Sequence, residues 1–515
     1  MAERKTIPLF SSYINRDYSD VLAKAQYMEN LFPIVTTNPI SSKSTVVIRK
    51  RPGMGSENAT VGSGQVGSTI WRSNSGSAPP VVFSFTTGGT VVFYSVVGTY
   101  QASYTQVGGA IANANACGGI TETLVSGVGN LVASVTDSGS GLNEYWYFPE
   151  GGAWTQITNG NFPLNQGTPL QIVGYPVYMD GYMFVMCKNG QIWNSDLNSL
   201  ANWSATSFIT AGDYPDTGVG LAKYRDMIVA VGNGSIEFFR NAGNPSGSPL
   251  QRISGMSLKI GARSPGSAYS GPFNYIEADG TIYWRGAEQG TGRIAIWKLN
   301  GGQPEKVSNS SIDILLNDAN ANSLGGVEVL GFLGTMNLHG MRHLVFANSN
   351  SGSAINAYWC YCIDINSWWV ISFNTNLLVN PISTIIGNEG STFVIPGTLA
   401  KQFRFLYSLF QDDGNAYTAT FQTAPLDEPS TNRKFVNRLR IIGDTQSSTS
   451  NLAVSYSDDD QVTYSTARNI DLSALNKELT RLGSHRYRRS WKFTHAANTD
   501  CRLQAFELER DTGTS

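Results

Sequence analysis

The stretch from Val219 to Asn241, VGLAKYRDMIVAVGNGSIEFFRN, is the feature that most constrains the fold of this chain. A short apolar run, Met227 to Val231, is followed by Asn233-Gly234 and by a second strand-forming run, Ser235 to Phe239. Asn-Gly favours a type I′ hairpin turn, because both central residues of that turn need φ > 0. The stretch therefore predicts short antiparallel strands joined by tight turns, the pattern of one blade of a β-propeller.

Units of this kind recur along the chain. Two-residue turns mark several of them, at Asp180-Gly181, Asn189-Gly190 and Asp279-Gly280. An outer-strand signature also recurs, at Trp154-Thr155-Gln156-Ile157, Trp203-Ser204-Ala205-Thr206, Leu250-Gln251-Arg252-Ile253, Glu305-Lys306-Val307 and Trp368-Trp369-Val370-Ile371. The first steps between units are close to the ~40–50 residues of a four-stranded blade. The units are a hairpin at 81–95 and segments at 123–157, 172–209, 219–253, 273–307, 338–373 and 382–410.

The number of units is six or seven, so the fold class that we expect is all-β, with a β-propeller over residues 81–417. A propeller usually closes by pairing an early strand with a late strand in one blade. This favours six blades, with seven as the alternative.

Residues 1–80 differ in composition from the propeller, and we expect them to form an N-terminal arm. Apolar residues at helical spacing, Val21, Leu22, Ala25, Met28 and Leu31, predict a short helix over Asp17 to Leu31. The eight Lys and Arg residues of Met1 to Gly53, against four Asp and Glu, indicate either a solvated face or a surface that docks on an acidic neighbour. We expect this arm to reach outside its own propeller.

Gly53 to Pro80 is rich in Gly, Ser and Thr and is expected to be a linker. Gly62 to Gly67 within it matches the GxGxxG pattern of dinucleotide-binding proteins. No clear strand precedes it and no helical pattern follows, so we interpret it as a flexible loop.

Residues 418–515 break the repeat. Phe435 to Ile442, Asn451 to Ser457, Trp491 to Thr494 and Arg502 to Glu509 alternate apolar and polar residues, which predicts a half-buried antiparallel sandwich. Asp471 to Leu482 is expected to be a short helix at most. Ser457 to Tyr464, SDDDQVTY, is similar to the Asp-box turn but lacks its Gly and Trp, so we interpret it as a hairpin turn.

Composition limits the classes of function. Only 14% of residues are charged, 11% are aromatic and the net charge is −2, which suits a protein whose surfaces are covered by neighbours. It argues against a dedicated nucleic-acid clamp or a binder of anionic membranes. No apolar run approaches the ~20 residues of a membrane-spanning segment, and the five scattered cysteines do not suggest a disulfide framework.

The residue types that carry catalysis or bind metals are few. The four histidines include His339 and His343, which on a strand lie about 13 Å apart, too far to share one ion. Cys360 and Cys362 fall on one face of a strand, where buried packing is the favoured interpretation and metal binding the alternative. The basic aromatic run from Arg486 to Lys492, flanked by His485 and His495, favours strand-edge charge and interface pairing over contact with phosphate or a stacked base. We therefore predict no catalytic, cofactor-binding or metal-binding residue, no cofactor and no enzymatic activity.

Four stretches resemble one known family. Gly220 to Phe239 looks like the core signature of the packaged-DNA stabilisation proteins of short-tailed phages, also called tail hub or nozzle proteins. Asn30-Leu31-Phe32-Pro33 followed by Arg51-Pro52-Gly53 is similar to the family's N-terminal pattern, with Phe32 where Tyr is commoner. Ile282 to Ile314 resembles the next blade, and Arg488 to Glu509 resembles the closing strands. The resemblance covers most of 201–400 and both ends.

The resemblance implies a virion structural protein of a phage tail, made in the host cytoplasm. It implies a homo-hexameric ring below the portal and its adaptor (the head-to-tail connector), with a distal tail plug or needle and tail fibre or spike proteins as further partners. Double-stranded DNA would pass through the ring without sequence-specific binding, and the ring would retain the packaged genome until ejection.

Two other classes remain open. A carbohydrate-binding or sialidase-like propeller would need several arginines and paired carboxylates at the mouth of the propeller. A receptor-binding adhesin could use the same scaffold. Between Gly53 and Ala222 the chain has nine acidic and two basic residues, a net charge of −7. We hypothesise that some of these carboxylates, such as Asp180, Asp196 and Asp213, line a DNA channel whose wall repels phosphate; the alternative is that they solvate outer loops.

Overall fold

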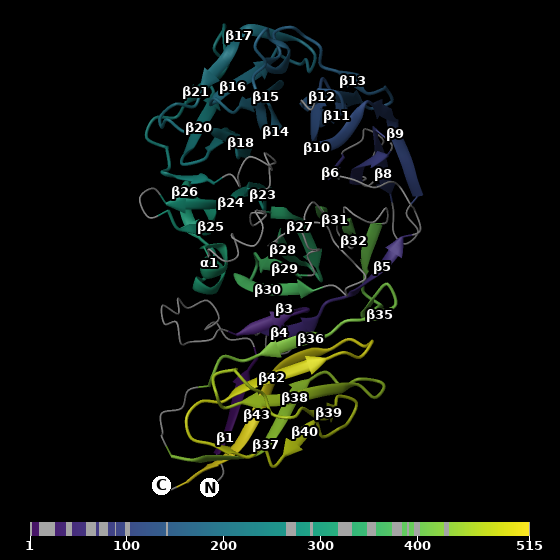
Figure 1. The fold of residues 1–515 in the computed structure, drawn as a ribbon, viewed down its shortest axis with the longest axis vertical. Coiled ribbons are helices and arrows are strands. Elements are labelled where there is room, and N and C mark those ends of the chain that lie inside the picture. The colour runs from purple at the N-terminus through teal and green to yellow at the C-terminus, as the bar shows by residue number, and fades with distance from the viewer. Residues whose placement is uncertain are drawn as a thin grey trace.

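The computed structural model describes residues 3–9, 26–37, 44–57, 68–71, 81–87, 89–97, 103–140, 143–263, 274–288, 292–317, 332–347, 357–372, 384–388, 391–395, 402–426 and 432–513. In these residues the regular structure is almost entirely β, and one α-helix is seen, α1 (Ser310–Asn317). Figure 1 shows a ring of small sheets with a second β unit attached at one side. The fold class is therefore all-β, as expected.

Within the described residues, seven groups of antiparallel strands form the ring, each counted from the centre outwards. Six groups have four strands, and the fifth has five because β22 and β23 both pair with β24. The seventh takes its outermost strand, β5, from the N-terminal part of the chain. The groups are, in order, β6 (Ser68–Ile70), β7 (Val81–Thr87), β8 (Thr90–Val97) and β9 (Ser103–Ala112); β10 (Ala114–Val125), β11 (Val128–Asp137), β12 (Asn143–Pro149) and β13 (Thr155–Gln156); β14 (Ile172–Met179), β15 (Tyr182–Cys187), β16 (Gln191–Ser195) and β17 (Trp203–Thr210); β18 (Gly218–Tyr224), β19 (Met227–Gly232), β20 (Ile236–Asn241) and β21 (Leu250–Arg252); β22 (Ile260–Ala262) with β23 (Tyr275–Ala278), β24 (Thr281–Glu288), β25 (Ile294–Asn300) and β26 (Gln303–Lys306); β27 (Phe332–Leu338), β28 (Met341–Ala347), β29 (Ala357–Cys362) and β30 (Ser367–Ser372); and β31 (Thr384–Asn388), β32 (Ser391–Ile395), β33 (Gln402–Leu406) and β5 (Gly53–Glu57).

The innermost strands close the ring. Each contacts the next, and β31 of the last blade contacts β6 of the first. β27 and β31 pair in parallel, so neighbouring innermost strands run in the same direction. The first and third turns of every blade consequently lie at one face of the ring, and the second turns and the links between blades lie at the other. The β-propeller is confirmed, and its blades number seven, the alternative count, rather than six.

The difference in blade number has a simple cause. β5 pairs with β33, so an early and a late strand do share a blade, as we expected for closure. The hairpin that starts at Val81 is not part of the blade that β5 completes. It belongs to a complete sheet of its own, β6 to β9, which adds one blade to the count.

Tight turns join the strands where the sequence predicted them. Asp180 and Gly181 both have positive φ, 52° and 86°, and Asp279 and Gly280 have φ of 52° and 68°. These two turns meet the requirement of a type I′ hairpin. The five segments of the outer-strand signature contain or overlap the outermost strands β13, β17, β21, β26 and β30 of their blades, which confirms the repeat inferred from them.

The second unit is a sandwich of two sheets. One sheet has the order β3 (Leu31–Thr37), β4 (Ser44–Lys50), β43 (Arg502–Thr512), β37 (Lys434–Gly443) and β40 (Glu478–Thr480), with β1 (Glu3–Pro8) on β43 and β41 (Ser484–His485) on β37. The other has the order β39 (Arg468–Asp471), β38 (Asn451–Ser457), β42 (Ser490–His495), β36 (Ala419–Gln422) and β2 (Tyr27–Glu29). Phe493 and Phe506 face each other between the sheets, with ring centroids 5.4 Å apart. The four alternating segments predicted for this sandwich are strands β37, β38, β42 and β43.

The N-terminal segment differs from the expectation. Tyr27–Glu29 and Leu31–Thr37 are strands, so the helix predicted up to Leu31 is wrong over its described part; residues 17–25 lie outside the described residues. β1 pairs with β43 and β2 with β36, so the described strands of the first 50 residues belong to the molecule's own sandwich. The linker expected from Gly53 to Pro80 contains β5 and β6, and the GxGxxG loop falls outside the described residues.

Two smaller points concern the sandwich and the helices. Asp471 to Leu482 is not helical: β39 ends at Asp471, whose carboxylate accepts bonds from Ser473 and Ser450, and β40 follows. The segment SDDDQVTY forms the start of the connection between the paired strands β38 and β39, as interpreted. None of the helices seen in the described residues has the length and apolar character to cross a membrane.

Candidate functional site

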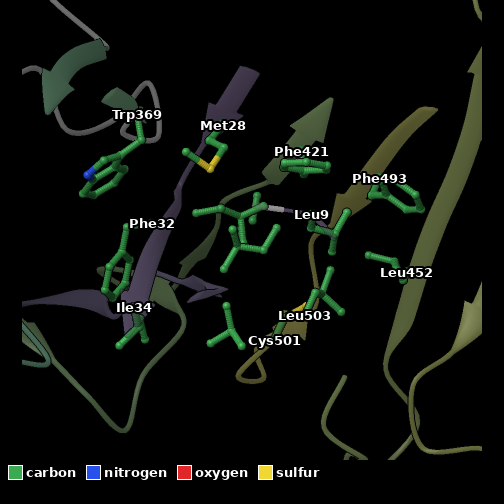
Figure 2. Close-up of a cluster of buried hydrophobic side chains, with 14 of the residues drawn as sticks. Leu9, Met28, Phe32, Ile34, Trp369, Phe421, Leu452, Phe493, Cys501 and Leu503 are labelled. Carbon is green, nitrogen blue, oxygen red and sulfur yellow. The ribbon is translucent and has the colours of Figure 1, made fainter. Parts of the chain in front are cut away.

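One hydrophobic core joins the propeller to the sandwich. Figure 2 shows side chains from both units in one buried cluster: Trp369 comes from the outer strand of the sixth blade, and Phe421 and Phe493 come from the sandwich. Phe32 on β3, a strand of the sandwich, packs against the sixth blade, with its ring 5.6 Å from that of Trp369. The sheets are also continuous here, because β2 pairs with β36 on one side and in parallel with β30 on the other. The two units therefore cannot separate without exposing apolar surface.

A buried ion pair lies beside this core. Arg51 donates two hydrogen bonds to the carboxylate of Asp412, at 2.8 and 2.5 Å, and both side chains are fully buried. The guanidinium also lies 3.8 Å from the centre of the Tyr417 ring. Burial disfavours the charged form of Arg51, but the carboxylate of Asp412 outweighs it and raises the pKa of Arg51. A charge-assisted, bidentate pair of this kind satisfies groups that would be costly to bury alone.

Asn30 connects the ion pair to the sixth blade. Its side-chain oxygen accepts from Arg51 Nε at 2.8 Å and from the backbone N–H of Ser372 at 3.1 Å. Its amide nitrogen donates to Ser372 Oγ and to the carbonyl of Thr418, both at 2.8 Å. The backbone of Asn30 has φ of 57°, a left-handed conformation that Asn tolerates better than most residues. One side chain thus ties together the N-terminal segment, a blade and the start of the sandwich.

The closing strand begins at this network. Gly53, the first residue of β5, packs so closely on the strand β34 (Gln411–Asp412) that an added Cβ would lie 2.2 Å from the carbonyl oxygen of Gln411. Met54 N–H donates to Asp412, at 3.2 Å. The same carboxylate therefore holds both Arg51 and the strand that completes the seventh blade.

These contacts give a structural role to the N-terminal pattern Asn30-Leu31-Phe32-Pro33 and Arg51-Pro52-Gly53. The prediction that the basic residues of this segment form a solvated or docking surface is wrong for Arg49, Lys50 and Arg51. Arg49 pairs with Asp500 at 2.6 Å, and Lys50 is buried and donates to the carbonyl of Ala497. The sequence does hold one signal of this network: Asn30 and Arg51 stand directly beside apolar residues, which is the setting of a buried polar side chain.

The signature stretch 219–241 packs closely against the fifth blade. An added Cβ at Gly220 would lie 2.3 Å from the hydroxyl oxygen of Tyr275, which donates to the carbonyl of Leu221 at 2.8 Å. Gly220 therefore lets the innermost strands of the fourth and fifth blades approach each other. This explains why glycine occupies that place in the signature.

The turn within the signature corrects a prediction. Asn233 and Gly234 do not have positive φ, so the turn is not type I′. Instead, the carboxylate of Asp216 accepts from the N–H of Gly234 at 2.6 Å and from Ser235 Oγ at 3.1 Å. Asp216 lies in the link between the third and fourth blades. Its hydrogen bonds stabilise a turn that differs from the type I′ turn favoured by Asn-Gly alone.

All four histidines are buried or partly buried near positive charge or apolar rings. Burial lowers the pKa of each to about 4: His339 beside Arg49, His343 against Phe32 and Trp369, His485 beside Arg489 and His495 near Lys50. His343 lies on β28, while His339 lies in the preceding turn. At neutral pH these side chains are uncharged.

The other candidate residues also pack in the interior. Cys360 and Cys362 are both fully buried on β29, which agrees with the interpretation of buried packing, and burial raises the pKa of the Cys362 thiol to about 12. Within the described residues, no group of three or more His, Cys, Asp or Glu side chains is arranged to hold a metal ion.

The structure separates the three carboxylates proposed for a channel wall. Asp180 lies in the first turn of the third blade and Asp196 at the start of its third turn, which are at one face of the propeller. Asp213 lies in the link from the third to the fourth blade, at the other face. Of the nine acidic residues between Gly53 and Ala222, only Glu122, on β10, is on an innermost strand.

The comparisons with known proteins agree with this architecture. The model of a family described as "Bacteriophage P22 Gp10, beta-propeller" matches residues 25–345. No curated protein matches the chain. Among solved structures, the crystal structure of the computationally designed Ika8 protein is similar at 10% identity, covering 74% of this chain and 100% of that one, with a TM-score of 0.32, at which no conclusion follows. The family match covers more than half of the chain and names the propeller that the strands form, so the chain belongs to the phage packaged-DNA stabilisation family typified by Gp10 of bacteriophage P22.

Proposed function

We propose that this protein is the nozzle or hub of a phage tail. Six copies form a ring below the portal and its adaptor, extend the DNA channel, retain the packaged genome and take part in its ejection. A distal plug or needle and tail fibre or spike proteins bind to the same ring. The observation that carries this proposal is the family match over residues 25–345, which makes the chain a phage structural stabilisation protein and a virion component.

The junction supports a load-resisting role. DNA packed in a capsid exerts pressure on the structure that closes the exit, so a subunit there must not come apart between its units. The shared core and the buried pair between Arg51 and Asp412 join the propeller to the sandwich on several sides. We propose two units that act as one body: a propeller of β5 to β33 and a sandwich of β1 to β4 with β36 to β43.

The proposed function is not enzymatic. The histidines have depressed pKa values because they are buried, and the arginines at the junction are paired inside the molecule. A sialidase-like site would need arginines and carboxylates that converge in an open cavity. We therefore propose a structural protein without a cofactor, located in the virion after assembly in the host cytoplasm.

The test is a phage that lacks the gene for this protein, complemented with the wild-type gene or with an Arg51→Ala variant. Particles without the protein should package DNA and then lose it, so their DNA should become sensitive to nuclease. Wild-type complementation should restore protection. Particles that stay protected without the protein would contradict its role in retaining the genome.

A further inference from the structure

The sandwich has a basic surface with exposed aromatic side chains. Residues 481–489 contain four arginines and no acidic residue. Arg481, Arg486 and Arg488 are exposed, as is Tyr487, at 72%. Phe435, which pairs with Ser484, is 44% exposed. We call the surface formed by Arg481, Arg486, Arg488, Tyr487 and Phe435 the tip.

The tip lies at the end of the molecule that is farthest from the propeller. Lys434, at the start of β37, pairs with both His485 and Thr512, so the tip is beside the C-terminal end of the chain. In Figure 1 the two chain termini lie at the bottom, at the end of the long axis opposite the ring.

The carboxylates nearest to the tip have partners within the sandwich. Asp458 forms a bidentate pair with the buried Arg489, at 2.7 and 2.8 Å. Asp459 and Asp511 accept only from neutral donors in the described residues, including the N–H of Thr463 and the side-chain amide of Asn437, so of these three carboxylates only Asp458 is paired with a cation there. In the described part of the chain, Arg481 and Arg486 form no ion pair, and the aromatic side chains of Tyr487 and Phe435 beside them are 72% and 44% exposed.

The opposite end of the molecule carries a surface of complementary character. The second and third blades, residues 114–210, contain six acidic residues and one basic residue, Lys188. Asp180 and Asp196 lie at the face of the first and third turns, where they accept only from neutral donors, Asn241 and Ser204. Lys188 lies in a second turn, at the other face.

Exposed aliphatic side chains accompany these carboxylates. Leu197 follows Asp196 and is 57% exposed, and Leu124, next to the first turn of the second blade, is 55% exposed. Leu197 packs against the turn at Gly181, so it is adjacent to Asp180. We call the surface formed by Leu124, Asp180, Asp196 and Leu197 the blade face. Figure 1 shows the second and third blades at the top, away from the sandwich.

We propose that the tip of one copy of this protein docks on the blade face of the next copy. Arginines and aromatic rings, which are enriched at protein interfaces, would meet carboxylates of opposite charge and aliphatic side chains. Because the two surfaces are different patches in different parts of the molecule, the contact is head-to-tail, and repeated contacts of this kind close into a ring when the rotation allows it. The inference rests on the proposed ring and assigns Asp180 and Asp196 to a contact between copies rather than to a channel wall.

Charge reversal provides the test. The tip variant carries Arg481→Glu and Arg486→Glu, and the face variant carries Asp180→Lys and Asp196→Lys. Each should weaken association of the purified protein at least about tenfold in sedimentation velocity, because like charges then face each other. The combined four-substitution variant should restore association. Asp213→Lys, at the opposite face of the propeller, is the matched control and should associate like the wild type.

Melting temperatures identify any variant that fails to fold, and single substitutions at Arg486 and Asp180 then replace the double ones. Rings that form equally well with the tip variant and the face variant would overturn the inference and leave the proposed function intact. A wild-type protein that stays monomeric, alone and with the portal and adaptor, would overturn both. Loss of DNA binding by the tip variant with unchanged rings would identify the tip as a nucleic-acid surface and would also overturn the inference.

Discussion

Arg51 and Asp412 are 361 residues apart in the chain and form a bidentate ion pair with both side chains fully buried. The pair lies where the closing strand of the propeller, the last blade and the sandwich meet. The pair can therefore form only when the N-terminal segment has packed against the segment that follows the last blade.

Removal of one partner of this pair should destabilise the protein strongly. Asp412→Ala leaves the Arg51 guanidinium buried without its carboxylate, and we expect a loss of about 3–5 kcal/mol in the free energy of unfolding. Urea denaturation followed by tryptophan fluorescence measures it. The exposed pair between Arg502 and Asp444 is the control, and Arg502→Ala should cost about 1 kcal/mol or less. Equal losses at the two sites would contradict the role assigned to the buried pair.

Gly53 should not tolerate a side chain. A Cβ there would lie 2.2 Å from the carbonyl oxygen of Gln411, so Gly53→Ala must displace β5 from its place. We expect a loss of about 1–3 kcal/mol or more and a lower melting temperature. Gly160→Ala, where nothing lies within 4 Å, is the matched control and should leave the melting temperature nearly unchanged. An unaltered melting temperature in Gly53→Ala would show that closure by β5 does not matter for stability.

Acid should destabilise the junction. The pKa of His343 is lowered from 6.5 to about 4 in the folded protein by burial, so the folded state binds its proton less readily than the unfolded state. The stability that this side chain contributes is present above pH 6.5 and is lost as the pH falls towards 4. His343→Phe should reduce the loss of stability between pH 7.5 and 4.5 by up to about 3 kcal/mol. Denaturation curves of both proteins at the two pH values check this, and identical losses would refute it.

The buried thiols should be unreactive in the native protein. Burial raises the pKa of Cys187, Cys362 and Cys501 to about 12, so very little thiolate is present at pH 8. Treatment with iodoacetamide followed by mass spectrometry should find these three cysteines unmodified in the native state and fully modified in denaturant. Rapid native labelling of Cys362 would contradict the packing described for β29.

The propeller could be predicted because its signals are local. The dipeptides Asp180-Gly181 and Asp279-Gly280 specify their turns through residues that tolerate positive φ, and an outer strand recurs in each unit. Asn233-Gly234 has the same local signal, yet the carboxylate of Asp216 from outside the turn selects another geometry. Local propensity fails there because a tertiary hydrogen bond decides.

The junction could not be predicted for the same reason. Met28 and Leu31 fit a helical stripe, but β2 and β3 gain their partners from β36, β30 and β4, and such long-range pairing leaves no periodic trace in the first 50 residues. The sequence alone does not show that Arg51 is buried, because its partner Asp412 lies 361 residues away in the chain. Family membership, in contrast, was recognisable from Gly220 to Phe239, since close packing on Tyr275 limits what residue 220 can be.

The central claim is that this chain is a ring-forming subunit of a phage tail. Cryo-electron microscopy of intact particles measures it most directly. The account predicts a six-fold ring of seven-bladed propellers below the portal and adaptor, each propeller joined to its own sandwich through β2 and β30. Particles whose tails contain no density for this fold, or a propeller that is present only as a detached monomer, would contradict it.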